Sequence, residues 1–520
     1  MDKIVVRRTS IVINNYEIGD SWQLEKKFSV YDQLTHKRFP KGIYYDTERN
    51  KAYIPRGINI GMLEHIFETN AVFDDSHDPF DVVDPILIRY LPRDEVQKEA
   101  IEFVLGQGKW VSNRYKSQLS VNLNTGKGKT YVAIAMMSTL RQRTIMITTN
   151  RDWISQWKKN VLEYTNIKDD EIYILNGSRS IVQLARGDID LNNIKFIMST
   201  HATIQSFAAK HGWESIAALF ASIRVGLKIY DEAHLNFDNM CMIDSFSNTF
   251  RTLYLTATPA RSDYGENIVY QLALKNVPKI DLFDEEKDPH TKYISMHFNS
   301  HPTPQQVSKC RTAYGFDRLH YIKYITDKPC FYQLLYILLD FCLQKEGKIL
   351  IYIGLNDAID KVYEWIEYNF PMLRGNIGKY NSTIPKDSRH GQLEKKIILS
   401  TLKSCGAAVD IKGLKITLLL ADPTGSLVQA RQALGRTRDR DTYFLDIVDD
   451  GFASLRRYYA KKRPMFNKYA ESMHDINITD QDLIERVDTI KEKINRQFAE
   501  QLSLWQDSNI GKLKTVVKRV

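Results

Sequence analysis

The sequence predicts an α/β protein with two tandem parallel-sheet domains, a small α+β unit in front of them and a helical segment behind. Two observations carry this prediction. Short β-branched runs alternate with helical stretches from about residue 90 onward, which is the pattern of βαβ units. A second series of the same kind begins at residue 347, beyond a stretch at roughly 281–340 that lacks the pattern.

The small N-terminal α+β domain is expected to span residues 1–85 and to end in the acidic, proline-containing run DDSHDPFDVVDP. It is interpreted as a small accessory domain with a possible role in DNA binding. Hydrophobic alternation and turn residues predict its elements. They are a strand at 10–15, a short helix at 21–32, two strands around a polar turn at 42–57 and a helix at 59–68.

The two larger domains are expected at 86–285 and 286–455, the second including the connecting stretch. A basic helical segment at 456–520 completes the chain. The apolar run FYQLLYILLDFCL contains Asp340 and is too short to span a membrane, so it is interpreted as a core helix. The predicted strands are 144–149, 196–200, 226–230 and 252–258 in the first domain, and 347–354, 397–401, 415–422 and 443–449 in the second.

Composition narrows the class of protein. The chain has 520 residues, of which 43% are hydrophobic and 26% charged, as in soluble globular proteins. No apolar run reaches about 18 residues, so we expect no membrane-spanning helix. The five cysteines lack CxxC spacing, which argues against a zinc site or a disulfide framework and favours a reducing cytoplasm. The net charge of +9 mildly favours a polyanionic partner.

A glycine-rich loop, LNTGKGKT, runs from Leu123 to Thr130 between a predicted strand and a predicted helix. Glycines let backbone amides turn toward a phosphate, and the helix N-terminus adds partial positive charge. Lys129 is expected to reach the β- and γ-phosphates of ATP, and the Thr130 hydroxyl to bind Mg²⁺. The alternative is a tight glycine turn, because Leu123 replaces the first glycine of the usual pattern. The expected nucleotide contacts are Thr125, Gly126, Lys127, Gly128, Lys129 and Thr130.

Two carboxylates follow an apolar strand about 100 residues later, in GLKIYDEAHL. At the end of a neighbouring parallel strand, Asp231 is expected to coordinate the same Mg²⁺ as Thr130. Glu232 is expected to orient and deprotonate an attacking water. A kinase does not need this second carboxylate, so the pair favours hydrolysis. A lone DEAH is more often the solvated start of a helix, and that alternative stays open. LYLTATPAR follows, where a segment coupling ATP to a polymer site is expected.

These motifs, in this order, resemble those of superfamily 2 helicases, which have tandem RecA-like domains. The resemblance covers roughly residues 90–455. Gln97 in LPRDEVQKEAI matches the glutamine that reads adenine in the family. LNTGKGKT, DEAH and LTATPAR match motifs I, II and III. In the second domain IILSTLKSCGAAVDIKGL resembles motif V, and QARQALGRTRDR resembles motif VI.

A narrower resemblance is to DNA translocases and repair helicases, through the QW element in RDWISQWKKNV and through STHATIQSF. The small unit in front and YFLDIVDDGFASLRRYYAKKR are closest in pattern to phage recombination helicases of the UvsW kind. The resemblance implies ATP and Mg²⁺ as cofactors. It implies DNA bound without sequence preference, contacts with replication or recombination proteins, no membrane, and the cytoplasm of a bacterium or a phage-infected cell.

Motif VI is expected to complete the ATP site. Arg436 would stabilise charge on the γ-phosphate, a contribution on the order of 10³–10⁵ in rate. The family's second arginine falls on Asp439 here, so Arg438 and Arg440 both stay open, and helical geometry favours Arg440. A solvated surface arginine is the alternative for Arg436. The predicted catalytic set is Lys129, Asp231, Glu232, Gln432, Arg436, Arg438 and Arg440.

Motifs Ia, Ib and V are expected to bind the phosphates of a nucleic-acid strand through hydroxyls and backbone amides. For each candidate, capping of a strand end is an equally good interpretation. Trp153 and Trp157 share one helix face and are expected in the core rather than stacked on bases. The candidate nucleic-acid contacts are Thr149, Asn150, Thr200, Thr401 and Asp410.

The leading hypothesis is an ATP-dependent DNA helicase or translocase that acts on duplex or branched DNA in replication, recombination or repair. An RNA helicase is a second hypothesis, because the motor alone does not specify the sugar. A third is a nucleic-acid-binding protein without motor activity, whose ATPase has decayed. The intact Lys129, Thr130, Asp231, Glu232 and Arg436 argue against the third.

Overall fold

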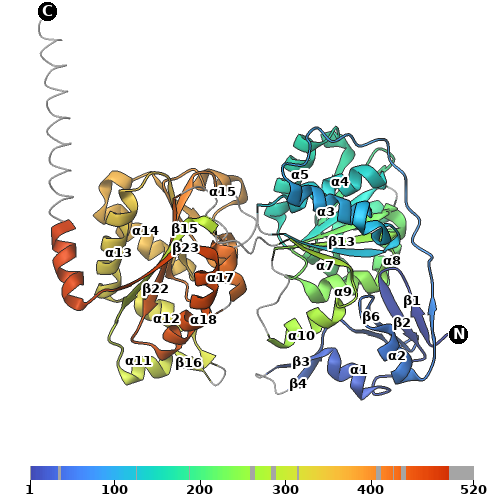
Figure 1. Cartoon of the computed structure of the whole chain (residues 1–520), viewed down its shortest axis with the longest axis horizontal. Coiled ribbons are helices and arrows are strands. Elements are labelled where there is room, and N and C mark those ends of the chain that lie inside the picture. Colours follow the sequence, from blue (N-terminus) through green and yellow to red (C-terminus); the bar gives the residue numbers. More distant parts are fainter. Residues whose placement is uncertain are drawn as a thin grey trace, which may run out of the picture. The chain divides into compact units, whose positions relative to one another are not determined.

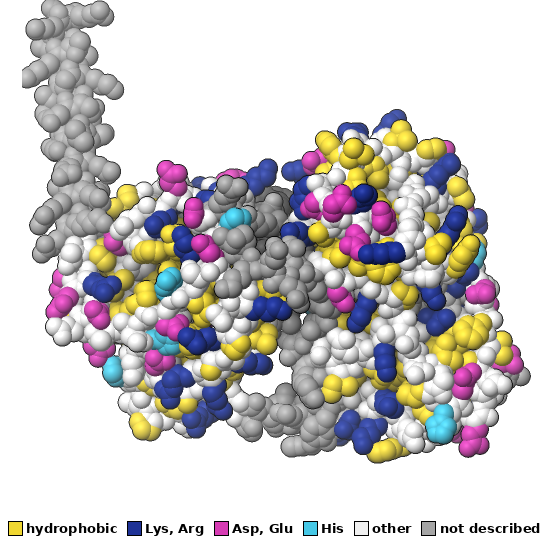
Figure 2. Space-filling view, in the orientation of Figure 1, with side chains coloured by type: hydrophobic (Ala, Val, Ile, Leu, Met, Phe, Trp, Pro, Cys, Tyr) yellow, Lys and Arg dark blue, Asp and Glu magenta, His cyan; other side chains and the backbone are white. Residues whose placement is uncertain are grey.

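The computed structural model describes residues 2–32, 37–123, 126–186, 188–257, 264–282, 288–312, 315–405, 411–425, 427–434 and 441–490. It divides into two compact units, Met1–Asp284 and Glu285–Val520 (Figure 1). On the face shown in Figure 2, basic, acidic and hydrophobic side chains are interspersed on both units. No helix in the described ranges is both long enough and apolar enough to cross a membrane.

The N-terminal module, residues 2–85, is a five-stranded sheet with the order β5-β6-β2-β1-β7. Its neighbours are antiparallel except β1 and β7, which are parallel. The predicted strand at 10–15, the strand pair within 42–57 and the helix at 59–68 are all present. The elements are β1 (Ile4–Val6), β2 (Ser10–Asn14), α1 (Trp22–Lys27), β3 (Ser29–Asp32), β4 (Lys37–Pro40), β5 (Tyr44–Asp46), β6 (Lys51–Pro55), α2 (Ile60–Phe67) and β7 (Ala71–Phe73).

The helix expected at 21–32 is shorter than predicted. α1 ends at Lys27, and residues 29–32 form β3, which pairs with β4 in a separate hairpin. Ser-Val-Tyr favours an extended backbone, and pairing with a partner strand outweighs the local helical pattern. This part of the prediction is therefore wrong.

The module shares its core with the rest of the first unit. Ile11 and Ile54 of the module belong to the same buried cluster as Phe237 and Tyr270. Phe237 starts α9 (Phe237–Phe246), and Tyr270 lies in α10 (Tyr264–Ala273). The predicted boundary at residue 85 therefore falls inside one packed unit. The assignment of residues 1–85 as a separate accessory domain stays a prediction.

The first unit contains a seven-stranded, all-parallel sheet with the order β10-β11-β9-β12-β13-β8-β14. Its central strands are buried along their length because helices cover both faces. α3, α4 and α5 cover one face and α6 to α10 the other. The strands are β8 (Gln118–Leu123), β9 (Thr144–Thr148), β10 (Ile172–Ile174), β11 (Phe196–Thr200), β12 (Leu227–Asp231), β13 (Arg251–Thr256) and β14 (Lys279–Leu282). The helices are α3 (Glu95–Leu105), η1 (Gly108–Tyr115), α4 (Lys129–Leu140), α5 (Arg151–Tyr164), η2 (Asp169–Glu171), α6 (Gly177–Ala185), α7 (His201–His211), α8 (Ser215–Ile223), α9 and α10.

The second unit contains another seven-stranded parallel sheet, with the order β19-β20-β18-β21-β22-β15-β23. The strands are β15 (Asp288–Phe298), β18 (Lys348–Ile353), β19 (Ile377–Tyr380), β20 (Ile397–Ser400), β21 (Leu414–Ala421), β22 (Thr442–Asp449) and β23 (Ala470–Asn477), with a small β16 (Arg311–Thr312) and β17 (Gly315–Phe316) hairpin. The helices are α11 (Pro304–Lys309), α12 (Arg318–Ile325), α13 (Pro329–Leu343), α14 (Asn356–Asn369), η3 (Pro371–Leu373), α15 (Lys386–Gln392), α16 (Leu402–Cys405), α17 (Leu427–Leu434) and α18 (Ala453–Tyr469).

The architecture of two parallel-sheet domains is confirmed, with two additions to the second sheet. β15 lies inside the stretch that was expected only to connect the domains. β23 interrupts the C-terminal segment, whose described remainder is helical at α18 and at 480–490. β23 is a largely exposed edge strand with few apolar residues, so its sequence carries no clear strand pattern. The core helix expected at FYQLLYILLDFCL is α13.

Candidate ATP site

Three neighbouring strands bring the predicted residues to one edge of the first sheet. β13 lies between β12 and β8, and all three are parallel. Asp231 ends β12 and pairs in register with Leu255, while Thr256 ends β13 and pairs with Asn122. Motifs I, II and III therefore meet at the carboxyl edge of the sheet, where open α/β sheets bind ligands.

The glycines of the loop adopt conformations that other residues rarely take. Gly126 and Gly128 have φ angles of 84° and 87°. Gly128 is the N-cap of α4, and a Cβ there would lie only 1.9 Å from Nε2 of Gln97. No side chain caps the helix, so its first amides are not used by a cap and can face a phosphate. Asn124 and the predicted contact Thr125 lie outside the described residues.

Gln97 lies directly against this loop. Its backbone N–H is capped by the Asp94 carboxylate at the start of α3, and its side-chain amide donates to Lys127 O over 3.4 Å. The Gln97 Oε1 accepts from Arg93 N at 2.8 Å, and the Arg93 guanidinium donates to Gly126 O at 3.3 Å. The structure thus brings Gln97 to the phosphate loop, and its contact with adenine stays a prediction.

Lys129 begins α4 and is almost fully buried, with 9% of its surface exposed. Its ammonium group donates to Leu123 O at 3.3 Å and lies 3.6 Å from Oε1 of Glu232. The Leu123 carbonyl and the Glu232 carboxylate thus hold the Lys129 ammonium beside the glycine loop, where it can bind the phosphates of a nucleotide.

Asp231 is buried and accepts a hydrogen bond at 2.7 Å from the indole N–H of Trp157 on α5. Burial raises the pKa of Asp231 to about 6, and the negative charge of Glu232 adds to this rise. The Trp157 hydrogen bond and the Lys129 charge oppose it. A buried carboxylate of this kind gains stability from a cation, so the site fits a divalent metal ion.

Glu232 has a left-handed backbone with φ of 50°, which is uncommon for a residue other than glycine. Its Oε2 lies 3.4 Å from the N–H of Ala257 and 3.5 Å from Nδ1 of His234. His234 in turn shares a 2.8 Å hydrogen bond with the Thr256 hydroxyl. The left-handed backbone turns the chain at Glu232, directly after β12 ends. Residues of motifs II and III then contact its carboxylate.

Thr130 is half-buried in the first turn of α4. The hydroxyl of Thr130 and the carboxylate of Asp231 form a hard oxygen donor set, which is the type that Mg²⁺ prefers. Among the described residues, no three or more His, Cys, Asp or Glu side chains cluster in a way that could hold a metal ion.

Three of the five predicted nucleic-acid contacts cap helices in the structure. Asn150 caps α5 by accepting from Asp152 N at 3.1 Å. Thr200 is 3% exposed and caps α7 by accepting from Thr203 N. Thr401 accepts from Ser404 N at 3.0 Å. Strand-end capping was the alternative interpretation, whereas these three side chains cap helices. Contact with a nucleic acid stays a prediction for them and for Thr149. Asp410 lies outside the described residues.

The structure describes the backbone of only the first part of motif VI. Gln432 lies in α17, but its side chain is outside the described residues, as are Arg436, Arg438 and Arg440. The roles assigned to these four residues stay predictions.

Two functional contacts were missed from the sequence. Trp157 was expected only in the core, and it also positions Asp231. Arg93 holds the Gly126 carbonyl. Neither contact has a signal in the sequence, because the partners are 74 and 33 residues apart along the chain.

Comparison with known families matches residues 91–261 to the family described as type III restriction enzyme, res subunit. This is about a third of the chain and covers motifs I, II and III.

Curated relatives match over similar lengths. The DNA 3'-5' helicase XPB of Kineococcus radiotolerans is 29% identical over 34% of this chain and 31% of its own length. The XPB of Mycobacterium tuberculosis is 30% identical over 29% of this chain and 25% of its own length. The ATP-dependent DNA helicase MPH1 of Scheffersomyces stipitis is 27% identical over 35% and 17%. The match thus spans less than a third of the length of each of these relatives.

One solved structure shares the fold. Dbp5 of S. cerevisiae, bound to RNA and ADP BeF3, matches with a TM-score of 0.51 and 13% identity over 77% of this chain and 93% of its own. T4 UvsW matches over 92% and 100%, with 15% identity and a TM-score of 0.35. The narrower resemblance to UvsW stays a prediction.

Proposed function

We infer that this chain is a member of the superfamily 2 helicases and an ATP-dependent motor that translocates along DNA. The observation that carries the inference is the meeting of Lys129, Asp231 and Glu232 at the carboxyl edge of one parallel sheet, beside a glycine loop. Curated relatives named as DNA helicases support the choice of DNA. Their match is partial, so activity and substrate are proposed for this chain rather than transferred to it.

Each residue of the candidate ATP site has a separate role in the proposed hydrolysis. The loop amides and Lys129 bind the β- and γ-phosphates of ATP. Thr130 and Asp231 hold Mg²⁺, which neutralises phosphate charge when bound. Glu232 orients a water and takes its proton. The contact of Ala257 N–H with Glu232, and of Thr256 with His234, gives β13 a direct connection to the catalytic carboxylate.

Gln432, Arg436 and either Arg438 or Arg440 keep the roles predicted from motif VI. Arg436 would supply the positive charge that the transition state requires beyond Lys129 and Mg²⁺. The proposed contacts with a nucleic-acid strand stay assigned to Thr149, Asn150, Thr200, Thr401 and Asp410.

We further propose that the substrate is duplex or branched DNA, in replication, recombination or repair, and that the chain works beside other proteins of those processes. The order of its motifs and its QW element support this. An RNA helicase is the second candidate, and the structural likeness to Dbp5 does not favour it, because that likeness concerns the fold alone.

The test is steady-state ATP hydrolysis by the full chain with single-stranded, duplex, forked and four-way DNA, and with single-stranded and duplex RNA. The proposal predicts stimulation by DNA, strongest with forked or four-way substrates. Stimulation by RNA alone would replace it with the RNA helicase. Absence of hydrolysis under every condition would favour the decayed ATPase.

A further inference from the structure

One helix of the second unit carries an unusual charge distribution. α18 has 17 residues, six of them basic and none acidic. Its buried side is formed by Leu455, Lys462 and Phe466. At 100° per residue, Arg457, Lys461 and Lys468 fall within about 40° of one another on the opposite side. All three side chains are exposed. We call Arg457, Lys461 and Lys468 the basic stripe.

The basic stripe is long enough to contact several successive phosphates of one DNA strand. Arg457 and Lys468 are eleven positions apart, which is about 16 Å along a helix. Phosphates of one DNA strand rise about 3.4 Å each along the duplex axis, so the stripe extends over about five of them. Pro464 lies on the same side between Lys461 and Lys468 and adds no negative charge.

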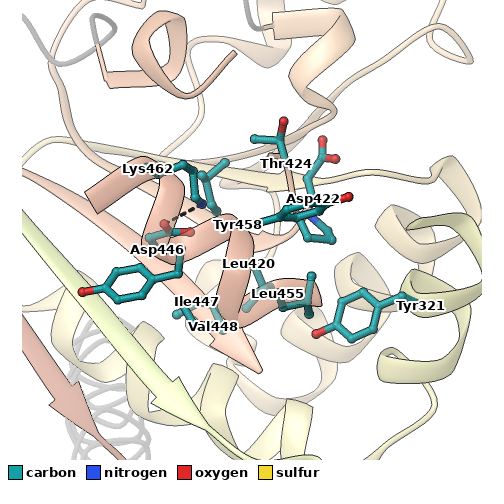
Figure 3. A pocket seen from close by; sticks show the side chains of 13 residues that line it. Tyr321, Leu420, Asp422, Thr424, Asp446, Ile447, Val448, Leu455, Tyr458 and Lys462 are labelled. Carbon is teal, nitrogen blue, oxygen red and sulfur yellow. Dashed lines mark hydrogen bonds and ion pairs between the residues drawn. The ribbon is translucent and has the colours of Figure 1, made fainter. Parts of the chain in front are cut away.

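Buried contacts fix α18 to the sheet. The Lys462 ammonium donates to the Asp446 carboxylate of β22 at 2.7 Å, and both side chains are buried (Figure 3). Tyr293 of β15 donates to the same carboxylate at 2.9 Å, and the ring of Phe466 stacks on Tyr293 with centroids 4.1 Å apart. Because the apolar side of α18 is used inside the fold, the helix cannot insert into a lipid surface as an amphipathic anchor does.

α18 also supports the loop that leads into the predicted motif VI helix. Tyr458 packs on Gly425 so closely that a Cβ there would lie 2.7 Å from its ring. Figure 3 shows Tyr458 beside Asp422 and Thr424, at a cavity of about 20 Å³. That volume holds about one water molecule, so α18 and this loop are closely packed and the cavity is too small for a ligand. α17 follows the loop directly and packs on α18.

We propose that the basic stripe of α18 binds the phosphate backbone of duplex DNA. This inference rests on the proposed DNA motor and adds a contact outside the motor motifs. The stripe reads no bases, since its cations meet only phosphate oxygens. Its buried attachment to β22 and β15 transmits force between the bound duplex and the second sheet.

The experiment measures how the affinity of the full chain for a blunt duplex DNA falls with salt concentration, by fluorescence anisotropy. Each phosphate contact contributes about 0.9 to the slope of log K against log salt. The triple variant Arg457→Gln, Lys461→Gln, Lys468→Gln should lose about 2 to 3 from the wild-type slope. Hydrolysis of ATP without DNA should stay at the wild-type rate, because these residues take no part in the ATP site.

The matched control removes the same charge from exposed residues elsewhere in the second unit, by Lys309→Gln, Arg311→Gln and Lys323→Gln. It should keep the wild-type slope. If the triple variant unfolds, Lys461→Gln alone should lose about 0.9. An unchanged slope in the stripe variants, an equal loss in the control, or an effect seen only with duplex RNA would overturn the proposal. A wild type that binds no DNA at all would instead contradict the proposed motor function.

Discussion

The indole N–H of Trp157 donates a hydrogen bond to Oδ2 of Asp231 across 2.7 Å, between α5 and the end of β12. Both side chains are buried. The tryptophan of the QW element thus reaches the carboxylate of motif II, so a residue that packs in the core also orients the expected Mg²⁺ ligand.

Trp157→Phe should weaken the use of Mg²⁺ in ATP hydrolysis. The variant keeps an aromatic ring but leaves the Asp231 oxygen without its donor, and loss of such an orienting contact typically costs about 10- to 100-fold in metal affinity. The measurement is the Mg²⁺ concentration that gives half-maximal hydrolysis. The control is Trp153→Phe on the same helix, because the Trp153 N–H has no hydrogen-bond partner in the described part of the chain. Equal effects of the two variants would show that Trp157 acts by packing alone.

Asp231→Asn should stabilise the nucleotide-free protein at about pH 8 by about 1 to 3 kcal/mol. The pKa of Asp231 is raised in the folded state to about 6, above its value in the unfolded chain. Protonated Asp231 therefore contributes fully to the stability of the folded state at low pH. This contribution is lost as pH rises through about 6, because the buried Asp231 carboxyl group then becomes charged. The gain from the neutral variant should shrink as pH falls from about 6 toward about 4. Chemical denaturation across this range measures it, and a gain independent of pH would contradict the assignment.

Lys228→Met should destabilise the first unit by about 3 to 5 kcal/mol. Lys228 is fully buried on β12, and its ammonium lies 2.6 Å from Oδ1 of Asp244. The Asp244 carboxylate also accepts from Tyr230 and Tyr254, and removal of the lysine leaves it buried without a cation. Thermal unfolding measures the effect against Lys210→Met, an exposed site expected to change by less than about 0.5 kcal/mol. Similar losses in both variants would refute a structural role for this pair.

Thr256→Val should lower the turnover of bound ATP by about 10-fold and change ATP affinity much less. The variant keeps the shape of the side chain but removes the hydroxyl that bonds His234, whose ring lies 3.5 Å from the Glu232 carboxylate. Pre-steady-state kinetics separate binding from turnover. Thr252→Val is the control, since it removes a hydroxyl contact with Thr249 at the other end of the same strand. A loss of affinity without a loss of turnover would exclude a link between motif III and the catalytic carboxylate.

The sequence predicted the parallel sheets and the ATP site because their signals are local. An apolar strand ends in a glycine loop at 123–130, and another ends in Asp231, so topology alone brings them to one edge. It did not predict β23, whose pairing with β15 depends on a partner about 180 residues earlier in the chain. It also missed the contact between Trp157 and Asp231, because core tryptophans look alike in sequence whether or not their N–H meets a catalytic group.

The central claim is that Glu232, beside Lys129 and Asp231, activates water for a DNA-driven ATPase. The most direct measurement is single-turnover hydrolysis of bound ATP on forked duplex DNA by wild type and Glu232→Gln, which keeps the shape of the side chain but cannot take a proton. We predict that DNA accelerates the wild type, and that the variant binds ATP normally but hydrolyses it at least about 100-fold more slowly. Hydrolysis by Glu232→Gln at the wild-type rate, or a wild type indifferent to DNA, would contradict the account.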